Sequence, residues 1–144
     1  MIVKITTTHE RAVIPRYATS GSAASDLHII LDEAVTLQPG EIYVAKTGLA
    51  LELPEGYVAI ICARSGLSTK HGICLANGVG VIDSDYRGEI HACLYNRSRL
   101  AFELTDGMRA AQMMIMPVTR AEFQKVESIN ETDRGTGGFG STGL

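Results

Sequence analysis

The chain has 144 residues, a length that fits one domain with a workable hydrophobic core. Its 13 basic and 16 acidic residues give a net charge of -3, so no long-range attraction to nucleic acid is expected. No stretch approaches a membrane span, and the start, MIVKITTTHERAVIP, lacks the basic flank and apolar run of a signal peptide. We therefore expect a cytoplasmic protein that has neither nucleic acid nor a membrane as a partner.

Short segments rich in β-branched and apolar residues dominate the chain, and no helical period is sustained over a dozen residues. In chain order the predicted strands are 1–5, 42–53, 57–62, 78–83, 89–96 and 113–118. Turn residues separate them, as at Pro39-Gly40, Asn77-Gly78 and Asp106-Gly107. Closely spaced short strands predict an all-β barrel or sandwich.

One brief helix is predicted from Ser65 to about Gly72, with Ser65 as its capping residue and Gly72 as its end. Arg64, Ser65 and Gly66 stand where a strand gives way to this helix. The unpaired N–H groups of a helix start, with the positive end of the dipole, favour phosphate. The alternative is an ordinary helix cap followed by a solvated arginine.

The segment NGVGVIDSDYRGEI, residues 77–90, runs from a predicted strand into an acidic turn. Asp83 and Asp85 would share a face in extended backbone, but they need not do so in a turn. Tyr86 and Arg87 follow directly, and an aromatic ring and a cation beside carboxylates suit a sugar phosphate. The alternative is a polar hairpin turn, in which aspartate is common.

Two further segments are weak signals when taken alone. Asp26 follows a small-residue loop at the edge of an apolar strand in SAASDLHI, and Arg109 and Gln112 open another strand in DGMRAAQMMI. Residues of these types are more often found at turns and edges than as ligands.

The segment RGTGGFGSTG, residues 134–143, combines five glycines with an arginine, hydroxyls and one aromatic ring. Such a composition offers N–H groups and a forked cation to phosphates and a stacking face to a base. The alternative is a solvated tail with nothing to bury. We expect residues 1–133 to form the domain and residues 134–144 to form a flexible arm that closes the active site.

A structural zinc site is disfavoured, although His71 with Cys74 and His91 with Cys93 supply four potential ligands. Both pairs lie in apolar, strand-like runs without a C-x-x-C spacing. We expect Cys62, Cys74 and Cys93 to be reduced thiols. A serine nucleophile is also disfavoured, because no G-x-S-x-G elbow is present.

Five segments, SAASDL, ARSGLSTKHG, NGVGVIDSDYRGEI, GMRAAQ and RGTGGFGSTG, occur in an order and spacing that resemble the five motifs of the trimeric dUTPases. The resemblance implies a jelly-roll-like β-barrel or sandwich that assembles as a homotrimer, with active sites at the subunit interfaces. It also implies hydrolysis of dUTP to dUMP and pyrophosphate with Mg²⁺ as cofactor. That reaction limits uracil in DNA and supplies dUMP for thymidylate synthesis.

The same resemblance suggests a role for individual residues. Asp83 would be the general base that activates water for attack on the α-phosphorus. Tyr86 would pack beneath the deoxyribose and exclude UTP. Asp26 would hold Mg²⁺ through water. Uracil would be read by the hairpin from Asn77 to Ile82, with the Asn77 side chain and the backbone of Gly80, Val81 and Ile82.

The triphosphate and the closing arm complete the expected site. Phe139 would stack on uracil, and the remaining substrate contacts would come from Arg64, Ser65, Gly66, Gln112, Arg134, Gly140, Ser141 and Thr142. Ser25, Ala63 and Ala110 differ from the residues that are usual at these positions of the family's motifs. These differences affect the shape of loops and the packing of the core.

Two alternatives stay open at the level of sequence. A dCTP deaminase shares this fold, but its catalytic glutamate position is filled here by Cys93. A non-catalytic β module that binds nucleotides would not need Asp83 and Tyr86 together with Arg134 and Phe139.

Overall fold

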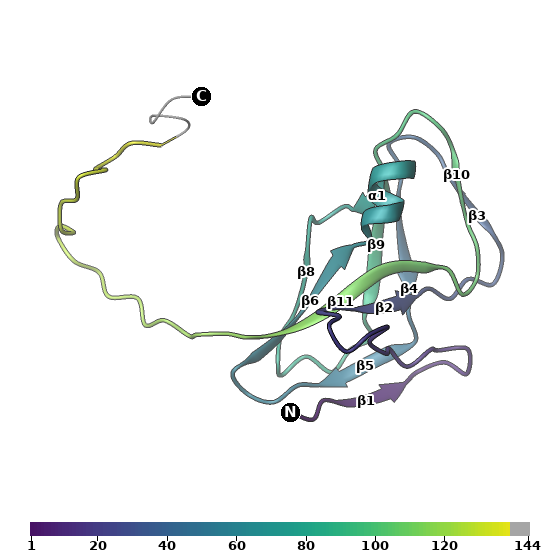
Figure 1. The fold of residues 1–144 in the computed structure, drawn as a ribbon, viewed down its shortest axis with the longest axis horizontal. Coiled ribbons are helices and arrows are strands. Elements are labelled where there is room, and N and C mark those ends of the chain that lie inside the picture. Colours follow the sequence, from purple (N-terminus) through teal and green to yellow (C-terminus); the bar gives the residue numbers. More distant parts are fainter. Residues whose placement is uncertain (139–144) are drawn as a thin grey trace.

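The computed structural model describes residues 1–138, and within them the chain forms eleven strands and one short helix (Figure 1). The elements are β1 (Lys4–Thr7), β2 (Ser25–His28), β3 (Val35–Leu37), β4 (Ile42–Lys46), β5 (Leu49–Glu52), β6 (Tyr57–Ala63), α1 (Ser65–His71), β7 (Ile73–Leu75), β8 (Gly80–Ile82), β9 (His91–Asn96), β10 (Phe102–Leu104) and β11 (Arg109–Pro117). The predicted mostly-β fold with one short helix is confirmed.

All strand pairs are antiparallel and form small sheets that pack against each other. A four-stranded sheet has the order β2-β11-β6-β8, and a three-stranded sheet has the order β4-β9-β7. The pairs β1-β5 and β10-β3 complete the fold, while contacts of β6 with β7 and of β11 with β9 join the two larger sheets. In this arrangement β8 is an edge strand, paired on one side only by β6.

The core lies between the sheets and is made from alternate residues of the strands. In β9, Ala92, Leu94 and Asn96 are buried, and in β6 Ala59 and Ile61 are buried, as the period of two requires. Full burial of a leucine or isoleucine side chain contributes roughly 1.5–3 kcal/mol, so this alternation fixes which residues face outward to form a site.

The predicted strand over 42–53 divides into two strands at a sharp corner. Gly48 has a φ of 69° and lies so close to Ile30 and Ala12 that a Cβ there would be 2.7 and 2.8 Å from their side chains. The buried Thr47 hydroxyl donates to the carbonyl of Ile90 over 2.6 Å. Glycine is needed at this corner both for its backbone conformation and for space.

The helix begins at Ser65, as predicted, but its N-cap lies one residue earlier than predicted. Arg64 is the N-cap, with extended backbone and no side-chain hydrogen bond, so the prediction that Ser65 caps the helix is wrong. The C-terminal prediction is confirmed, because Gly72 has a φ of 71° and donates its N–H to the carbonyl of Leu67.

Residues 118–138 contain neither strand nor helix, and in Figure 1 they run away from the sheets as an extended segment. The N–H of Val118 bonds to the carbonyl of Gly56, where this segment leaves β11. Within residues 1–138, no helix is both long and apolar enough to cross a membrane. Cys62, Cys74 and Cys93 are half-buried free thiols.

Candidate active site

Three neighbouring strands place Asp26, Gln112 and Cys62 side by side. Gln112, near the middle of β11, is directly opposite Asp26 of β2 and directly opposite Cys62 of β6. Directly paired residues project from the same face of a sheet. These three side chains, which come from distant parts of the sequence, therefore form one row. The Gln112 amide donates to the carbonyl of Ala63 over 2.9 Å, which ties this row to the end of β6.

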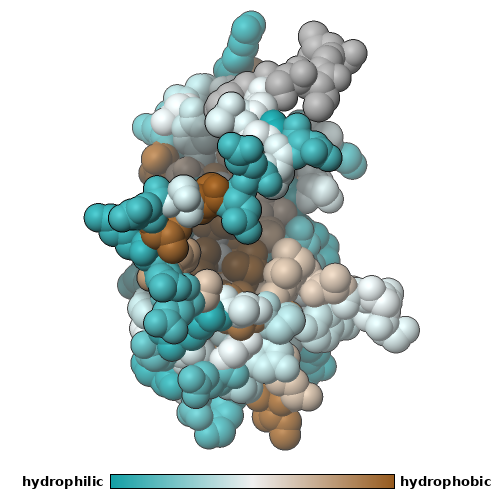
Figure 2. Space-filling model, turned by 90° about the vertical axis from the view of Figure 1, so that its left-hand side faces the viewer, coloured by the Kyte–Doolittle hydropathy of each residue, from teal (hydrophilic) through white to brown (hydrophobic). Residues whose placement is uncertain are grey.

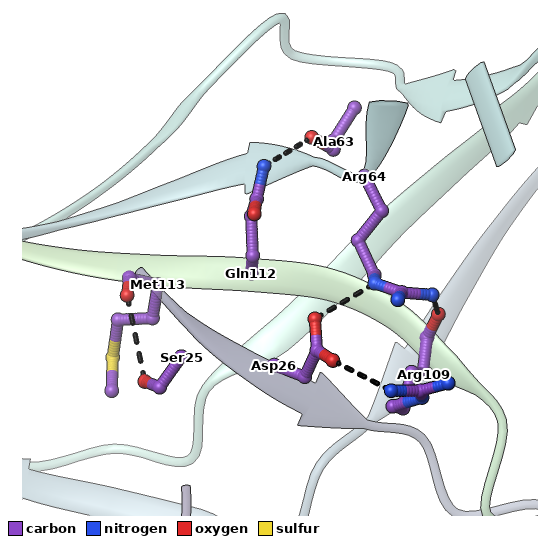
Figure 3. A network of polar contacts seen from close by, with 7 residues as sticks. All are labelled: Ser25, Asp26, Ala63, Arg64, Arg109, Gln112 and Met113. Atoms are coloured by element: carbon purple, nitrogen blue, oxygen red, sulfur yellow. Dashed lines mark hydrogen bonds and ion pairs between the residues drawn. The ribbon is translucent and has the colours of Figure 1, made fainter. Parts of the chain in front are cut away.

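The Asp26 carboxylate lies between two arginines (Figure 3). Arg64 Nε donates to Asp26 Oδ1 over 2.8 Å, and Arg109 Nη1 donates to Asp26 Oδ2 over 3.2 Å. The Asp26 and Arg64 side chains are only 28% and 27% exposed, so water screens this pair less than a surface pair. A guanidinium has five N–H donors, and each arginine therefore keeps donors that could reach an anion.

The first turn of α1 lies directly beyond Arg64. Ser65 and Gly66 are exposed, and a Cβ on Gly66 would meet nothing within 4 Å. The first N–H groups of a helix have no intrahelical acceptor, and the first turn of α1 carries no acidic residue that could occupy them. The amides of Ser65 and Gly66 are thus open to a phosphate beside the guanidinium of Arg64.

The acidic segment after β8 forms a tight, hydrogen-bonded turn. The N–H of Tyr86 bonds to the carbonyl of Asp83 over 3.2 Å. Arg87 Nη1 donates to the carbonyls of Ser84 and Tyr86 over 2.7 and 3.0 Å. Asp83 and Asp85 are therefore both in a turn and not in extended backbone. Asp83 is exposed and forms no ion pair with any residue in the range 1–138.

The strand that leads into this turn, β8, presents an unpaired edge. Before it, Gly78 has a φ of 73°, and Val79 N–H bonds to the carbonyl of Asn77 over 2.8 Å, in a turn that joins β7 and β8 of different sheets. Since β8 is paired only by β6, its outer N–H and C=O groups have no strand partner. Such an edge can pair with the edge of a base, and Val81 beside it is 58% exposed.

An open cleft of about 690 Å³ lies beside the acidic turn. Its lining comes from the acidic turn, the 53–58 segment and the start of the 118–138 segment, and consists of Leu53, Glu55, Gly56, Tyr57, Val58, Val81, Asp83, Ser84, Asp85, Arg87, Val118 and Arg120. Figure 2 shows a hollowed face on which hydrophobic residues gather inside a hydrophilic rim. Asp26, Arg64 and Gln112 do not line this cleft.

Within one chain the predicted site residues therefore fall into two groups. Asp26, Arg64, Ser65, Gly66 and Gln112 gather where β6 meets α1. Asn77, Gly80, Val81, Ile82, Asp83 and Tyr86 follow β8 and its turn.

The distance between these groups can be estimated from strand register. Ile82 pairs with Ala59, so Asp83 comes level with Val58 at the far end of β6. From Val58 to Arg64 the strand spans about 20 Å, at roughly 3.3 Å per residue. One chain alone does not bring Asp83 to Arg64.

The segment after the sheets contains one more predicted residue that the structure describes. Arg134 Nε donates to the carbonyl of Gly137 over 2.9 Å, within its own turn, and contacts neither group. Phe139, Gly140, Ser141 and Thr142 lie outside the described residues.

Two arginines, one in each group, support the predicted site residues but were not among them. Arg109 grips Asp26, and its own carbonyl accepts a hydrogen bond from Arg64 Nη1 over 2.9 Å. Arg87 clamps the acidic turn. In the sequence, Arg109 could be noticed because it lies three residues before Gln112. Only the pairing of β11 with β2 shows that its partner is Asp26.

Within residues 1–138, no group of three or more His, Cys, Asp or Glu side chains is placed to hold a metal ion. Cys74 Sγ instead lies 3.9 Å from the carbonyl of Tyr95, and the His71 ring packs on Phe102 with centroids 5.1 Å apart. A cation at this site would depend on ligands from a bound substrate or another chain.

Comparison with known proteins gives one consistent result. The dUTPase family model matches residues 10–143. A deoxyuridine 5'-triphosphate nucleotidohydrolase of Burkholderia cenocepacia is 51% identical over 142 residues, covering 98% of this chain and 96% of the relative. An enzyme of the same name from Neisseria meningitidis serogroup A is 53% identical over 133 residues, covering 92% and 89%.

Solved structures agree with the sequence relatives. The Staphylococcus bacteriophage 80alpha dUTPase with dUPNHPP has a TM-score of 0.89 at 26% identity and covers 99% of both chains. A mutant dUTPase from phage phi11 of S. aureus, described with a structural Mg(II) ion, has the same fold, with a TM-score of 0.82 at 24% identity and coverage of 91% and 100%. The family model and the near full-length relatives together show that this chain belongs to the dUTPase family.

Proposed function

We propose that this protein hydrolyses dUTP to dUMP and pyrophosphate, with Asp83 activating the water that attacks the α-phosphorus. The dUTP diphosphatase activity follows from the family and from relatives that are 51% identical over almost the whole chain. The observation that supports Asp83 as the base is its exposed carboxylate at the head of a hydrogen-bonded turn, where it forms no ion pair with any residue of 1–138. A carboxylate that no ion pair holds can accept a proton from water.

General-base catalysis by one carboxylate accounts for roughly 10²–10⁴-fold of the rate. The remaining acceleration requires charge neutralisation on the triphosphate. We assign this to Arg64, the amides of Ser65 and Gly66, the Gln112 side chain and, from the arm, Arg134. Arg64 donates its Nε–H to the Asp26 carboxylate, and this bond fixes the direction of the remaining N–H donors of the guanidinium.

Mg²⁺ is the proposed cofactor, and Asp26 is the residue that would hold it. Both Asp26 oxygens already accept hydrogen bonds from arginines, which suits contact through a water better than direct ligation. Mg²⁺ commonly keeps several waters and takes its other ligands from substrate phosphates. When bound in this way the ion neutralises charge on the triphosphate.

The base and sugar are assigned to the group around β8. The free outer edge of β8, from Gly80 to Ile82, would pair with uracil, helped by the Asn77 side chain. A backbone edge with fixed donors and acceptors rejects cytosine, whose pattern is reversed. Tyr86 would lie beneath the deoxyribose and leave no space for a 2'-hydroxyl.

A homotrimer with shared sites is the assembly that we propose. Asp83 and Arg64 are about 20 Å apart along β6 in one chain, by the rise of a strand, so a site that uses both must combine two chains. Exposed apolar side chains on two strands, Ile42 and Val44 of β4 and Val81 of β8, offer surfaces to bury in such an assembly. We further propose that residues 134–144 act as an arm that closes over bound substrate, with Phe139, Gly140, Ser141 and Thr142 contributing contacts.

The deaminase alternative is not favoured. Cys93, at the position of the catalytic glutamate, is a half-buried thiol in the middle of β9. A thiol there does not replace a carboxylate.

The test is to incubate the purified protein with dUTP, dCTP, dTTP and UTP in Mg²⁺ and to separate the products by chromatography. We expect dUMP and pyrophosphate from dUTP alone. Absence of dUMP would contradict the proposed reaction, and uracil nucleotides formed from dCTP would favour deamination.

A further inference from the structure

The ring of Tyr86 lies against the backbone of Gly88 and leaves no room for a side chain there. A Cβ on Gly88 would overlap Tyr86 Oη, with Tyr86 Cζ at 2.5 Å and Cε2 at 2.9 Å. Gly88 is not among the glycines with positive φ, so its backbone would accept alanine without strain. Glycine is needed at this position because of the Tyr86 ring and not because of the backbone.

Both ends of Tyr86 are held by the same short segment. Its N–H bonds to the carbonyl of Asp83 over 3.2 Å, and its hydroxyl donates to the carbonyl of Glu89 over 3.1 Å. Tyr86 as a whole residue is nevertheless 44% exposed. One part of the ring is therefore seated on Gly88 and Glu89, while the rest is available to a ligand.

The seat itself is anchored to the core. Glu89 Oε1 accepts the N–H of Gly48 over 2.8 Å, and Ile90 N–H bonds to the carbonyl of Leu49 over 2.8 Å. The Thr47 hydroxyl donates to the carbonyl of the fully buried Ile90. Since these bonds hold the Glu89 side chain and the backbone of Ile90 directly beyond Gly88, we expect a methyl group on residue 88 to displace the Tyr86 ring and not the backbone.

We propose that Gly88, with the anchored carbonyl of Glu89, is a positioning residue that sets the height and tilt of the Tyr86 ring and so determines how strictly a 2'-hydroxyl is rejected. The inference rests on the proposed role of Tyr86 at the sugar. Rejection of an added hydroxyl depends on close steric fit, because a loose apolar surface discriminates poorly against such a group. A Tyr86 ring that is displaced from Gly88 and Glu89 no longer provides that fit.

The test compares kcat/KM for dUTP and UTP in wild type, Gly88→Ala, Tyr86→Ala and the double variant. We expect Gly88→Ala to lower the ratio of the dUTP to the UTP value by about tenfold or more, the scale of fit-based discrimination. In the Tyr86→Ala background the Gly88→Ala change should have no further effect, because no ring remains to be displaced. Gly21→Ala is the matched control, since a Cβ there meets nothing within 4 Å and Gly21 has no positive φ.

Folding is checked by thermal melting of the same four proteins. If Gly88→Ala lowers the melting temperature, adding Tyr86→Ala should restore it to the value of Tyr86→Ala alone. An unchanged substrate ratio in Gly88→Ala, or an equal fall of that ratio in both backgrounds, would overturn the inference.

Wild-type rates separate this inference from the proposed function. A wild type that leaves dUTP intact contradicts the proposed function and removes the basis of the inference. A wild type that hydrolyses dUTP but also UTP equally well overturns the role of Tyr86 alone. Discrimination in wild type that Gly88→Ala retains overturns only the positioning by Gly88.

Discussion

Arg64 donates through Nη1 to the backbone carbonyl of Arg109 over 2.9 Å, so the two cations that hold Asp26 are also joined to each other. The two guanidiniums are tolerated beside one another because the Asp26 carboxylate lies between them, with one oxygen for each. The three residues come from β2, the start of α1 and β11, and they behave as one electrostatic unit (Figure 3).

Replacing Asp26 with asparagine should disturb both stability and the use of Mg²⁺. The change leaves two guanidiniums without an anion between them, which we expect to cost on the order of 1 kcal/mol at this partly exposed place. The concentration of Mg²⁺ needed for half-maximal activity should rise several-fold. Thermal melting and a Mg²⁺ titration of activity measure the two effects.

The matched control for Asp26 is Asp32→Asn. Asp32 also accepts a hydrogen bond from an arginine, Arg11 at 2.6 Å, but its side chain is almost fully exposed. That variant should keep the wild-type Mg²⁺ titration. An Asp26→Asn enzyme with an unchanged titration would remove Asp26 from the metal site.

Asp83→Asn should lower kcat by about 10²–10⁴-fold with little change in KM, because it removes the base but not the substrate contacts. Release of pyrophosphate measures the rate. Asp85→Asn changes the same charge two residues away in the same turn and should keep most of the activity. Equal losses in the two variants would indicate a general effect of charge and not a base at position 83.

Periodicity and turn residues were sufficient for the mostly-β fold and for the end of α1 at Gly72. They missed the corner at Gly48, because a run of apolar residues on both sides looks like one strand. They also did not identify β3, β7 and β10, which have three residues each and too little pattern to recognise.

The residues of the candidate site could be predicted from sequence motifs, but their arrangement in space could not. Arg64 and Asp83 are close in the sequence, yet strand register places them at opposite ends of β6. The contact of Arg109 with Asp26 depends on the pairing of β11 with β2, which no local pattern reveals. Similarly, Gly88 is an ordinary turn glycine in the sequence, and only the folded Tyr86 ring shows why it is required.

Asp106 should contribute to stability in a way that depends on pH. The N–H of Leu31, and with it the guanidinium of Arg11 3.0 Å away, lowers the pKa of Asp106. A carboxyl whose pKa is lower in the folded state stabilises fully above its ordinary pKa of about 3.9 and loses this effect as pH falls through the folded value. The melting temperature of Asp106→Asn should therefore be below that of wild type at pH 7, and the difference should shrink below about pH 4.

The control for this pH series is Glu122→Gln, which removes one charge from the exposed 118–138 segment, where this side chain has no ion pair within residues 1–138. Its melting temperature should follow the wild-type curve. A difference between wild type and Asp106→Asn that stays constant down to pH 3 would contradict the assigned cause.

Deletion of residues 134–144 should leave the fold intact and greatly reduce kcat/KM for dUTP. Among the described residues of this segment, 134–138, the hydrogen bonds run only to Thr132 and within the segment itself, so none of them reaches the core. Thermal melting should give the wild-type value, while product formation falls. A truncation that lacks only Leu144 is the control. An unfolded product would show that the segment is structural.

Mixing two inactive variants tests whether one site combines two chains. Asp83→Asn retains the arm, and the truncation at 133 retains Asp83. If a site takes its base from one subunit and its arm from another, random reassembly of equal amounts restores about a quarter of the sites. Product formation after joint refolding, compared with each variant refolded alone, measures this recovery.

The same mixture distinguishes the shared site from a site within one chain. If Asp83 and the arm act in the same subunit, every mixed assembly contains only defective sites, and activity stays at the level of the separate variants. Wild type refolded with an equal amount of Asp83→Asn controls for refolding losses, and about half of all sites in that mixture should be active, since half of the bases are intact. Recovery in the first mixture would mean that the base and the arm of one site come from different subunits, so that assembly, and not a movement within one chain, completes the site.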